Sequence, residues 1–191
     1  SVAIFGAGQG AEFSNSFTQP FVIGQLEYTT KLFGGLPGTY RVYAWNNPQY
    51  ESYDGSTGKN LGWGLSLDQQ VHEDLALFTR VGYTMSGRVT FDRAVTVGAE
   101  VTGNAWNRGA DKVGLAFGWL RSSDGFRKAS GGLADFGYTA DGAEKDAELY
   151  YRYRVNDHVS LTPDLQVIQN PGANPDADTV TAVGLRALYA F

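Results

Sequence analysis

Charged residues of the kind that take part in catalysis recur along this chain of 191 residues. Asp68, Glu100 and Asp164 are acids that could act in pairs as general acid and base. Each falls, however, in a segment where apolar and polar residues alternate, and arginines occupy equivalent positions in neighbouring segments. Ion pairs between these acids and arginines are therefore the simpler interpretation, and we predict no catalytic residue among them.

The chain offers little for nucleophilic or metal chemistry. It contains no cysteine, and its two histidines, His72 and His158, fall in short polar turns. Neither a serine–histidine arrangement nor the spacing of a metal site is evident in the sequence. Acidic residues in the segment 172–178 could bind calcium, but a solvated loop is the simpler account. We therefore expect no metal site, no cofactor and no enzymatic activity.

Composition restricts the class of protein. The net charge of −5 and the pI near 4.9 argue against binding to nucleic acid. No uninterrupted apolar run approaches the roughly 18 residues of a transmembrane helix. A transmembrane β-barrel stays open, because alternation halves the apparent hydrophobicity of each span. The chain starts at Ser1 without an initiator methionine, so we expect a mature or truncated polypeptide.

Nine segments alternate between apolar and polar residues, which is the pattern of a β-strand with two different faces. Each is about ten residues long, and this length suits a strand that crosses a bilayer at a tilt. Residues 1–6 could end a further strand, and no segment has convincing helical periodicity. The predicted strands are 21–31, 39–45, 61–68, 75–84, 95–102, 112–119, 147–155, 159–167 and 180–191.

The connections between these strands also follow a pattern. Long polar segments lie at 46–60, 121–145 and 169–179, whereas 72–74 and 156–158 are short turns. With one exception, the longer connections fall on one side of the predicted sheet. Outer-membrane barrels have long extracellular loops and short periplasmic turns. We therefore predict that the short turns and the C-terminal end lie on the periplasmic side.

The last segment, Val180–Phe191, alternates up to the final residue, although the ends of soluble domains tend to fray. The strand that closes an outer-membrane barrel cannot fray, because it pairs with the first strand. The segment resembles the C-terminal insertion signal of such barrels. The residues that would form this signal are Val183, Leu185, Tyr189 and Phe191.

The two faces of the predicted strands differ in kind. One face is apolar and carries tryptophan and tyrosine near the strand ends, as the interfacial girdle of a membrane barrel would. The other face repeatedly carries charge, which favours the polar wall of a channel over the solvated face of a soluble sheet. The predicted channel-lining residues are Arg41, Tyr43, Trp45, Asp68, Arg80, Glu100, Lys112, Glu148, Tyr150, Arg152, Arg154, Asp164 and Arg186.

Four stretches resemble the C-terminal half of the carbohydrate-selective porins of the OprB family. They are GTYRVYAWNN (38–47), NLGWGLSLDQQVHEDLALFTRVGY (60–83), FDRAVTVGAEVTGNAWNRGADKVGLAFG (91–118) and ELYYRYRVNDHVSLTPDLQVIQNPG (148–172). The terminal LRALYAF also resembles the ending of that family. The resemblance implies a sixteen-stranded barrel in the bacterial outer membrane, through which sugars or other small solutes pass by facilitated diffusion.

A barrel of nine or ten strands would be too narrow for a sugar, because barrel diameter grows with strand number. The resemblance therefore implies that residues 1–191 form one domain, the C-terminal part of a larger, all-β, antiparallel transmembrane barrel. We expect Phe21–Lys31 or Ser1–Gly6 to lie at an edge that is unpaired or pairs with N-terminal strands outside this sequence. The expected partners are small solutes such as sugars, outer-membrane lipids and the barrel assembly machinery, and association of several copies stays open.

Aromatic residues on a channel wall can stack on the apolar faces of sugars while neighbouring charges bind hydroxyl groups. Tyr43 and Trp45 beside Arg41 are the first candidates for such contacts, and Tyr150 with its charged neighbours is the second. Two other classes of protein stay open. One is a small closed outer-membrane barrel with an enzymatic or structural role, and the other is a soluble β-sandwich that binds a ligand.

Overall fold

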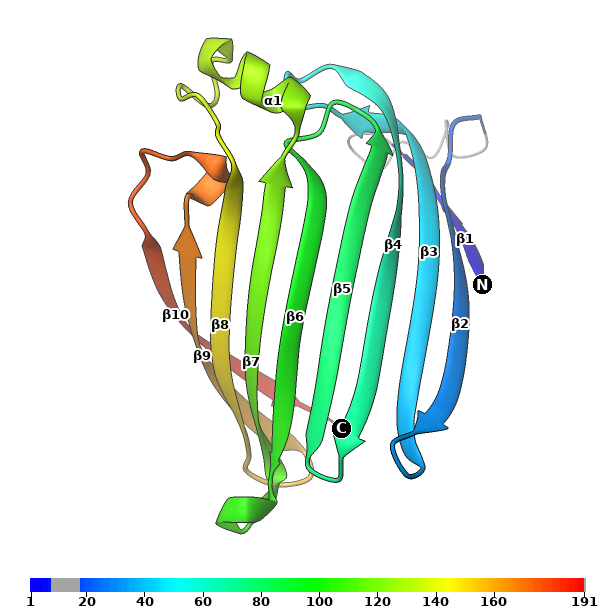
Figure 1. Ribbon diagram of the computed structural model, residues 1–191, viewed down its shortest axis with the longest axis vertical. Coiled ribbons are helices and arrows are strands. Elements are labelled where there is room, and N and C mark those ends of the chain that lie inside the picture. Colours follow the sequence, from blue (N-terminus) through cyan, green and yellow to red (C-terminus); the bar gives the residue numbers. More distant parts are fainter. Residues whose placement is uncertain (8–17, 191) are drawn as a thin grey trace.

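The computed structural model describes residues 1–7 and 18–190, which form one antiparallel sheet with a short helix at one end (Figure 1). Within the described residues the sheet has ten strands, and each strand pairs with its neighbours in sequence. All the predicted strands are present, and residues 1–6 contain a further short one. The strands are β1 (Val2–Phe5), β2 (Phe21–Leu32), β3 (Leu36–Glu51), β4 (Thr57–His72), β5 (Leu75–Ser86), β6 (Phe91–Gly103), β7 (Arg108–Ser122), β8 (Ala143–Arg154), β9 (Val159–Gln169) and β10 (Val180–Tyr189).

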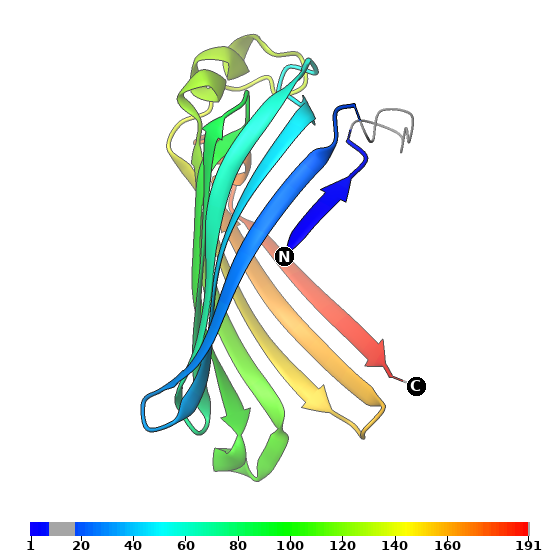
Figure 2. The ribbon, with the colours of Figure 1, turned by 90° about the vertical axis from the view of Figure 1, so that its right-hand side faces the viewer.

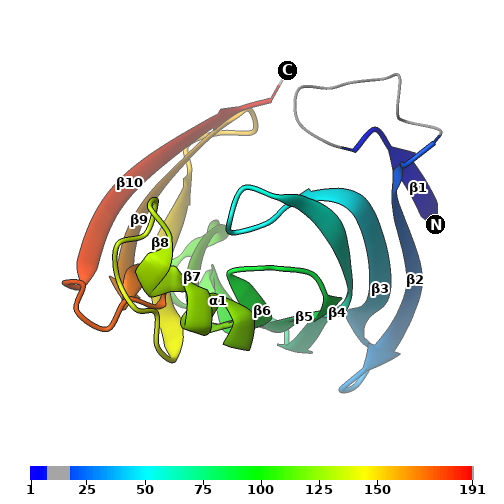
Figure 3. The ribbon, with the colours of Figure 1, turned by 90° about the horizontal axis from the view of Figure 1, so that it is seen from above.

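The sheet curves into an arc whose edge strands are β1 and β10. Figure 3 shows this arc from above, and Figure 2 shows the two edges apart on the same side of the molecule. β10 pairs with β9 along its whole length, whereas β1 pairs through only four residues with the start of β2. No pairing joins β1 to β10 in the described part of the chain. The fold is therefore a partial barrel wall, and the predicted edge within Ser1–Gly6 is confirmed.

The hairpin of β3 and β4 is longer than the sequence predicts. The segment 46–60, which the sequence analysis assigns to a long loop, is mostly strand. Pairing continues beyond Asn47 and Asn60 and, after a bulge, reaches Glu51 and Thr57. The prediction is wrong because polar residues occupy both faces here, so the alternation disappears although the backbone hydrogen bonds continue.

The segment 121–145 contains a helix that the sequence pattern does not predict. Helix α1 spans Asp124–Ala129, and the Ser123 hydroxyl at its start accepts a hydrogen bond from the Phe126 backbone N–H at 3.0 Å. Fewer than two helical turns are too short to show a period of 3.6 residues, which explains the miss. No helix in the described residues is long and apolar enough to span a membrane.

A buried apolar cluster lies at the upper end of the sheet in Figure 1, beside α1. Phe126, Ala140 and Ala173 are buried together, and the Phe126 ring meets Phe136 edge to face at 4.7 Å. Hydrogen bonds join the same connections: the Ser123 hydroxyl donates to the Val89 carbonyl at 2.6 Å. The long connections at this end are therefore fastened to one another, whereas the opposite end carries only short turns.

Candidate functional site

Every predicted channel-lining residue lies on the same face of the sheet, called the polar face below. Residues that pair directly on adjacent antiparallel strands share a face. Arg41 pairs with Ser66, which also pairs with Arg80, and Lys112 pairs with Arg152. The remaining predicted residues follow by alternation along their own strands. The structure thus gathers side chains from eight strands, β3 to β10, onto one wall.

An ion cluster joins β2, β3, β4 and β5 on the polar face. The Arg41 guanidinium contacts Glu27 through Nε–Oε2 at 2.6 Å and Asp68 through Nη1–Oδ2 at 3.0 Å. The other Asp68 oxygen lies 2.5 Å from Arg80 Nη2. Asp68 therefore neutralises two arginines at once, which matches the ion-pair interpretation of this acid.

A second ion cluster joins β6, β7 and β8. Glu100 forms an ion pair with Lys112, accepts a hydrogen bond from the Tyr150 hydroxyl at 2.7 Å, and lies 3.9 Å from Arg152. The contact between Tyr150 and Glu100 crosses the whole of β7 above Gly114, which pairs with both residues. Gly114 carries no side chain, so the Tyr150 ring can lie across β7 and reach Glu100. We infer that the polar face is the concave face of the arc, where side chains of neighbouring strands converge.

Aromatic rings on the polar face lie flat over glycines of the next strand. A β-carbon at Gly64 would overlap the Tyr43 ring, and one at Gly62 would overlap Trp45. The two rings are stacked, with centroids 6.1 Å apart and planes at 30°. Glycine is required at these positions because any side chain would lift the rings off the sheet. The rings are thus held along the wall with one face turned away from it.

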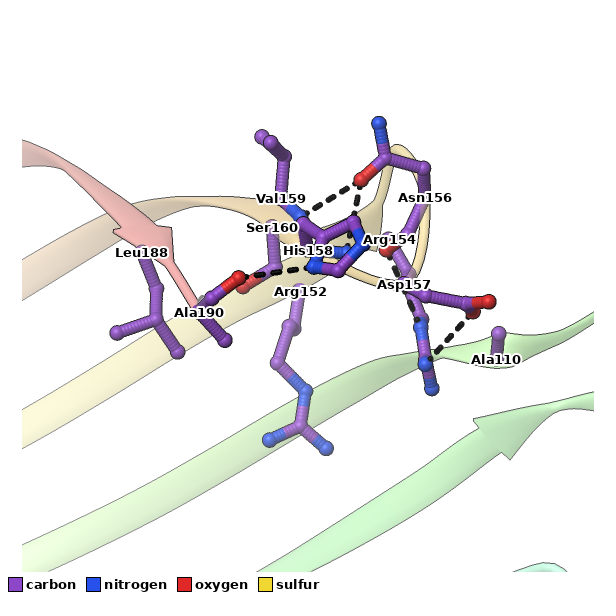
Figure 4. A pocket seen from close by; sticks show the side chains of 10 residues that line it. All are labelled: Ala110, Arg152, Arg154, Asn156, Asp157, His158, Val159, Ser160, Leu188 and Ala190. Atoms are coloured by element: carbon purple, nitrogen blue, oxygen red, sulfur yellow. Dashed lines mark hydrogen bonds and ion pairs between the residues drawn. The ribbon is translucent and has the colours of Figure 1, made fainter.

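The lower end of the polar face contains an open pocket of about 310 Å³, shown in Figure 4. Arg152 extends into it, whereas Arg154 turns toward Asp157 and pairs with it at 3.0 Å. His158, predicted in a turn, lies at the pocket edge with Nδ1 2.9 Å from the Ala190 carbonyl. This histidine fastens the end of β10 to the turn before β9.

Three predicted charged residues belong to neither ion cluster and form no ion pair in the described part of the chain. Asp164 accepts a hydrogen bond from Gln166 at 3.1 Å, and no cation lies within 4 Å of it in the described residues, so the expected ion pair of this acid with an arginine is wrong. Glu148 and Arg186 share the polar face without an ion pair among the described side chains. Glu27 also lies on the polar face, although it is not among the predicted residues; its position opposite Arg41 in the hairpin is the signal that could have found it.

The predicted insertion signal lies on the opposite, apolar face of β10. Val183 is 82% exposed and Leu185 is 70% exposed, and both alternate with polar-face residues. Phe191 lies outside the described residues. Tyr189 also belongs to this face and contacts the His158 ring at 6.3 Å between centroids.

Two carboxylates in turns have lowered pKa values. Asp74, in the short turn before β5, accepts hydrogen bonds from the Thr102 hydroxyl and the Asn104 amide, and these lower its pKa. Asp54, in the turn after β3, accepts a hydrogen bond from the Ser56 hydroxyl at 2.6 Å, which lowers its pKa with help from Arg88. Both acids thus fasten turns at opposite ends of the sheet.

Comparisons with known proteins agree on one family. A family model described as carbohydrate-selective porin, OprB family, matches residues 2–191. Porin B of Pseudomonas aeruginosa is 25% identical over 189 residues, which cover 82% of this chain and 42% of that protein. Porin AaxA of Chlamydia pneumoniae is 28% identical over 127 residues, which cover 66% of this chain and 27% of that protein.

A solved structure shares the fold. The structure of Pseudomonas putida OprB at high pH matches with a TM-score of 0.78 at 22% identity, over 95% of this chain and 52% of that one. The chain therefore spans about half the length of the relatives that it matches, or less.

Proposed function

Because this chain belongs to the OprB family of carbohydrate-selective porins, we propose that it forms part of the wall of an outer-membrane channel for sugars and other small polar solutes. The observation that carries the proposal is the division of one curved sheet into two faces. The convex face is apolar and exposed, as contact with lipid requires, and the concave face carries the charges and flat aromatic rings. Diffusion through this channel, and not catalysis, is the proposed activity.

The open edges of the sheet support the proposal of a larger barrel. Unpaired strand edges are not viable in lipid, because their backbone N–H and C=O groups would lack partners. Since the matched relatives are about twice as long, we propose that further strands of the same barrel pair with β1 and β10. The proposed surroundings are the outer-membrane lipids, with the barrel assembly machinery recognising the end of β10.

The polar face offers two kinds of contact to a sugar. The exposed ring faces of Tyr43 and Trp45 can stack on the apolar face of a pyranose, and the neighbouring Arg41 can donate hydrogen bonds to its hydroxyls. Tyr150 and Arg152 offer a second group of donors near the lower end. Because both arginines already lie near carboxylates, each contact would be weak, and a solute could move from one to the next.

Liposome swelling tests the proposal. The porin, purified at the length at which the cell makes it, is reconstituted and exposed to isotonic solutions of mono- and disaccharides. We expect swelling that slows as sugar size increases, and a further slowing for sugars in the double variant Tyr43→Ala/Trp45→Ala relative to an uncharged polyol without an apolar ring face. Absence of swelling with every sugar would remove the porin assignment, and equal effects on sugar and polyol would remove the stacking role.

A further inference from the structure

Basic side chains gather on the apolar face of the sheet at its upper end, where lipid contact would otherwise favour apolar residues. Arg93 on β6 and Arg121 on β7 pair directly, and Arg93 also pairs with Tyr83 of the apolar face. Lys145 on β8 pairs with Trp119, two positions along β7 from Arg121. Arg127 of α1 joins the group through Asp124. The name "basic patch" denotes these four cations: Arg93, Arg121, Arg127 and Lys145.

The basic patch is short of counter-ions. Asp124 lies 3.2 Å from Arg121 Nη2 and also pairs with Arg127, so one carboxylate serves two arginines. Arg93 and Lys145 have no carboxylate within 4 Å in the described part of the chain. Like charges directly opposite on neighbouring strands repel, and the pairing of Arg93 with Arg121 is such a case. An external anion would relieve this repulsion.

Aromatic residues next to the basic patch place it at the level of lipid head groups. Trp63 and Tyr83 are in ring contact at 6.1 Å, and the Arg93 guanidinium lies 5.6 Å from the Tyr83 ring centroid. Tryptophan and tyrosine on a lipid-facing surface gather at the membrane–water interface. The patch lies toward the end with the long connections, which is the outer-leaflet side of the proposed barrel.

The opposite end of the same face handles its cation differently. Arg108 lies 2.8 Å from the buried Asp111 carboxylate, stacks on Tyr153 at 4.4 Å from the ring centroid, and donates to the Arg154 carbonyl at 3.0 Å. This arginine is neutralised and held by the protein itself. At Arg108 the protein thus supplies the counter-ion that Arg93 and Lys145 lack at the basic patch.

We propose that the basic patch binds the phosphate groups of an acylated, phosphorylated glycolipid in the outer leaflet, an inference that rests on the proposed outer-membrane location. Guanidinium groups donate pairs of hydrogen bonds that match phosphate geometry, and Lys145 adds a flexible point charge. The aromatic residues below the patch lie where the sugar backbone and the first carbons of the acyl chains would rest. A phosphorylated lipid would therefore contact both the cations and the aromatic residues, whereas free phosphate would contact only the cations.

Binding of lipid A to the purified full-length porin in detergent tests the proposal. The probes are bisphosphorylated lipid A, the same lipid without phosphates, and inorganic phosphate as competitor. We expect at least tenfold tighter binding of the phosphorylated lipid, and a loss of about tenfold in Arg93→Gln/Lys145→Gln. The control is Lys31→Gln, which removes an exposed lysine at the opposite end of the sheet and should leave binding unchanged within about twofold.

Equal affinity for the two lipids, or an unaffected Arg93→Gln/Lys145→Gln variant, would overturn the proposal. Competition by inorganic phosphate at concentrations equal to those of the lipid would also overturn it, because the site would then recognise the free anion. Liposome swelling with sugars is measured on the same variants. Unchanged swelling with no lipid preference would remove only the lipid site, and absent swelling would remove the proposed function.

Discussion

Replacing Asp68 by asparagine should shift the channel toward anions. Asp68 is the shared counter-ion of Arg41 and Arg80, at 3.0 and 2.5 Å. The change removes one negative charge from the wall, leaves Arg80 without a carboxylate within 4 Å in the described residues, and leaves Arg41 with Glu27. The side chain of Asp68 is 39% exposed, so solvent screens the pair and the loss of stability should be about 1 kcal/mol.

The size of the selectivity shift follows from Coulomb's law. An ion that passes about 5 Å from a unit charge in water experiences about 0.8 kcal/mol, and screening at about 0.1 M salt lowers this to about 0.5 kcal/mol. Removing the negative charge takes away this stabilisation for cations and the equal repulsion for anions. The two effects add to about 1 kcal/mol, so the cation-to-anion permeability ratio should fall about fivefold.

Reversal potentials of the reconstituted porin in planar bilayers, under a gradient of KCl, measure that ratio. Asp68→Glu keeps the charge and serves as the control, for which we expect the wild-type ratio. An Asp68→Asn channel with unchanged or more cation-selective conduction would show that Asp68 does not face the conducting path, and the assignment of the polar face as the channel wall would fail with it.

Three further predictions concern stability. Gly114→Ala should destabilise the barrel by about 1–3 kcal/mol, because the new methyl group overlaps the Tyr150 ring. Gly82→Ala should not destabilise it, because its methyl group makes only an ordinary contact at 3.9 Å. Heat-modifiable gel migration compares the two variants, and equal unfolding midpoints would refute the packing argument. Asp74→Asn should make the heat stability of the barrel less sensitive to acid. Because the pKa of Asp74 is lowered in the fold, its carboxylate stabilises the folded state at pH values above the unfolded-state pKa of about 3.9, and this contribution is lost as pH falls through the folded-state pKa. Identical acid sensitivity in the variant would show that Asp74 does not stabilise the turn. Phe126→Ala should destabilise the buried apolar cluster at the upper end by about 3–5 kcal/mol. The segment after α1 should then be cleaved by protease added to intact cells. Full resistance to the protease would show that the cluster does not hold the connections together.

The alternation of the sequence determined the strands, their two faces and the residues of the polar face. This information is local, because successive side chains of a strand point to opposite sides whatever the strand pairs with. The assignment of Arg41, Glu100 and Arg186 to one face therefore needed no coordinates. The sequence pattern did not predict two elements. The strands within 46–60 show no alternation because they are polar on both faces, and α1 is too short to show a helical period.

Register and curvature decided the rest. Tyr150 and Glu100 are separated by 50 positions in sequence, and they meet because both pair with Gly114, which leaves room for the Tyr150 ring between them. The direct pairing of Arg93 with Arg121 likewise depends on which residues of β6 and β7 face each other, and a shift of β7 by one position would send the Arg121 side chain to the other face. The sequence by itself determined which face each charge occupies, and only the tertiary structure decided which charges meet, because contacts between strands depend on register and curvature that no single strand encodes.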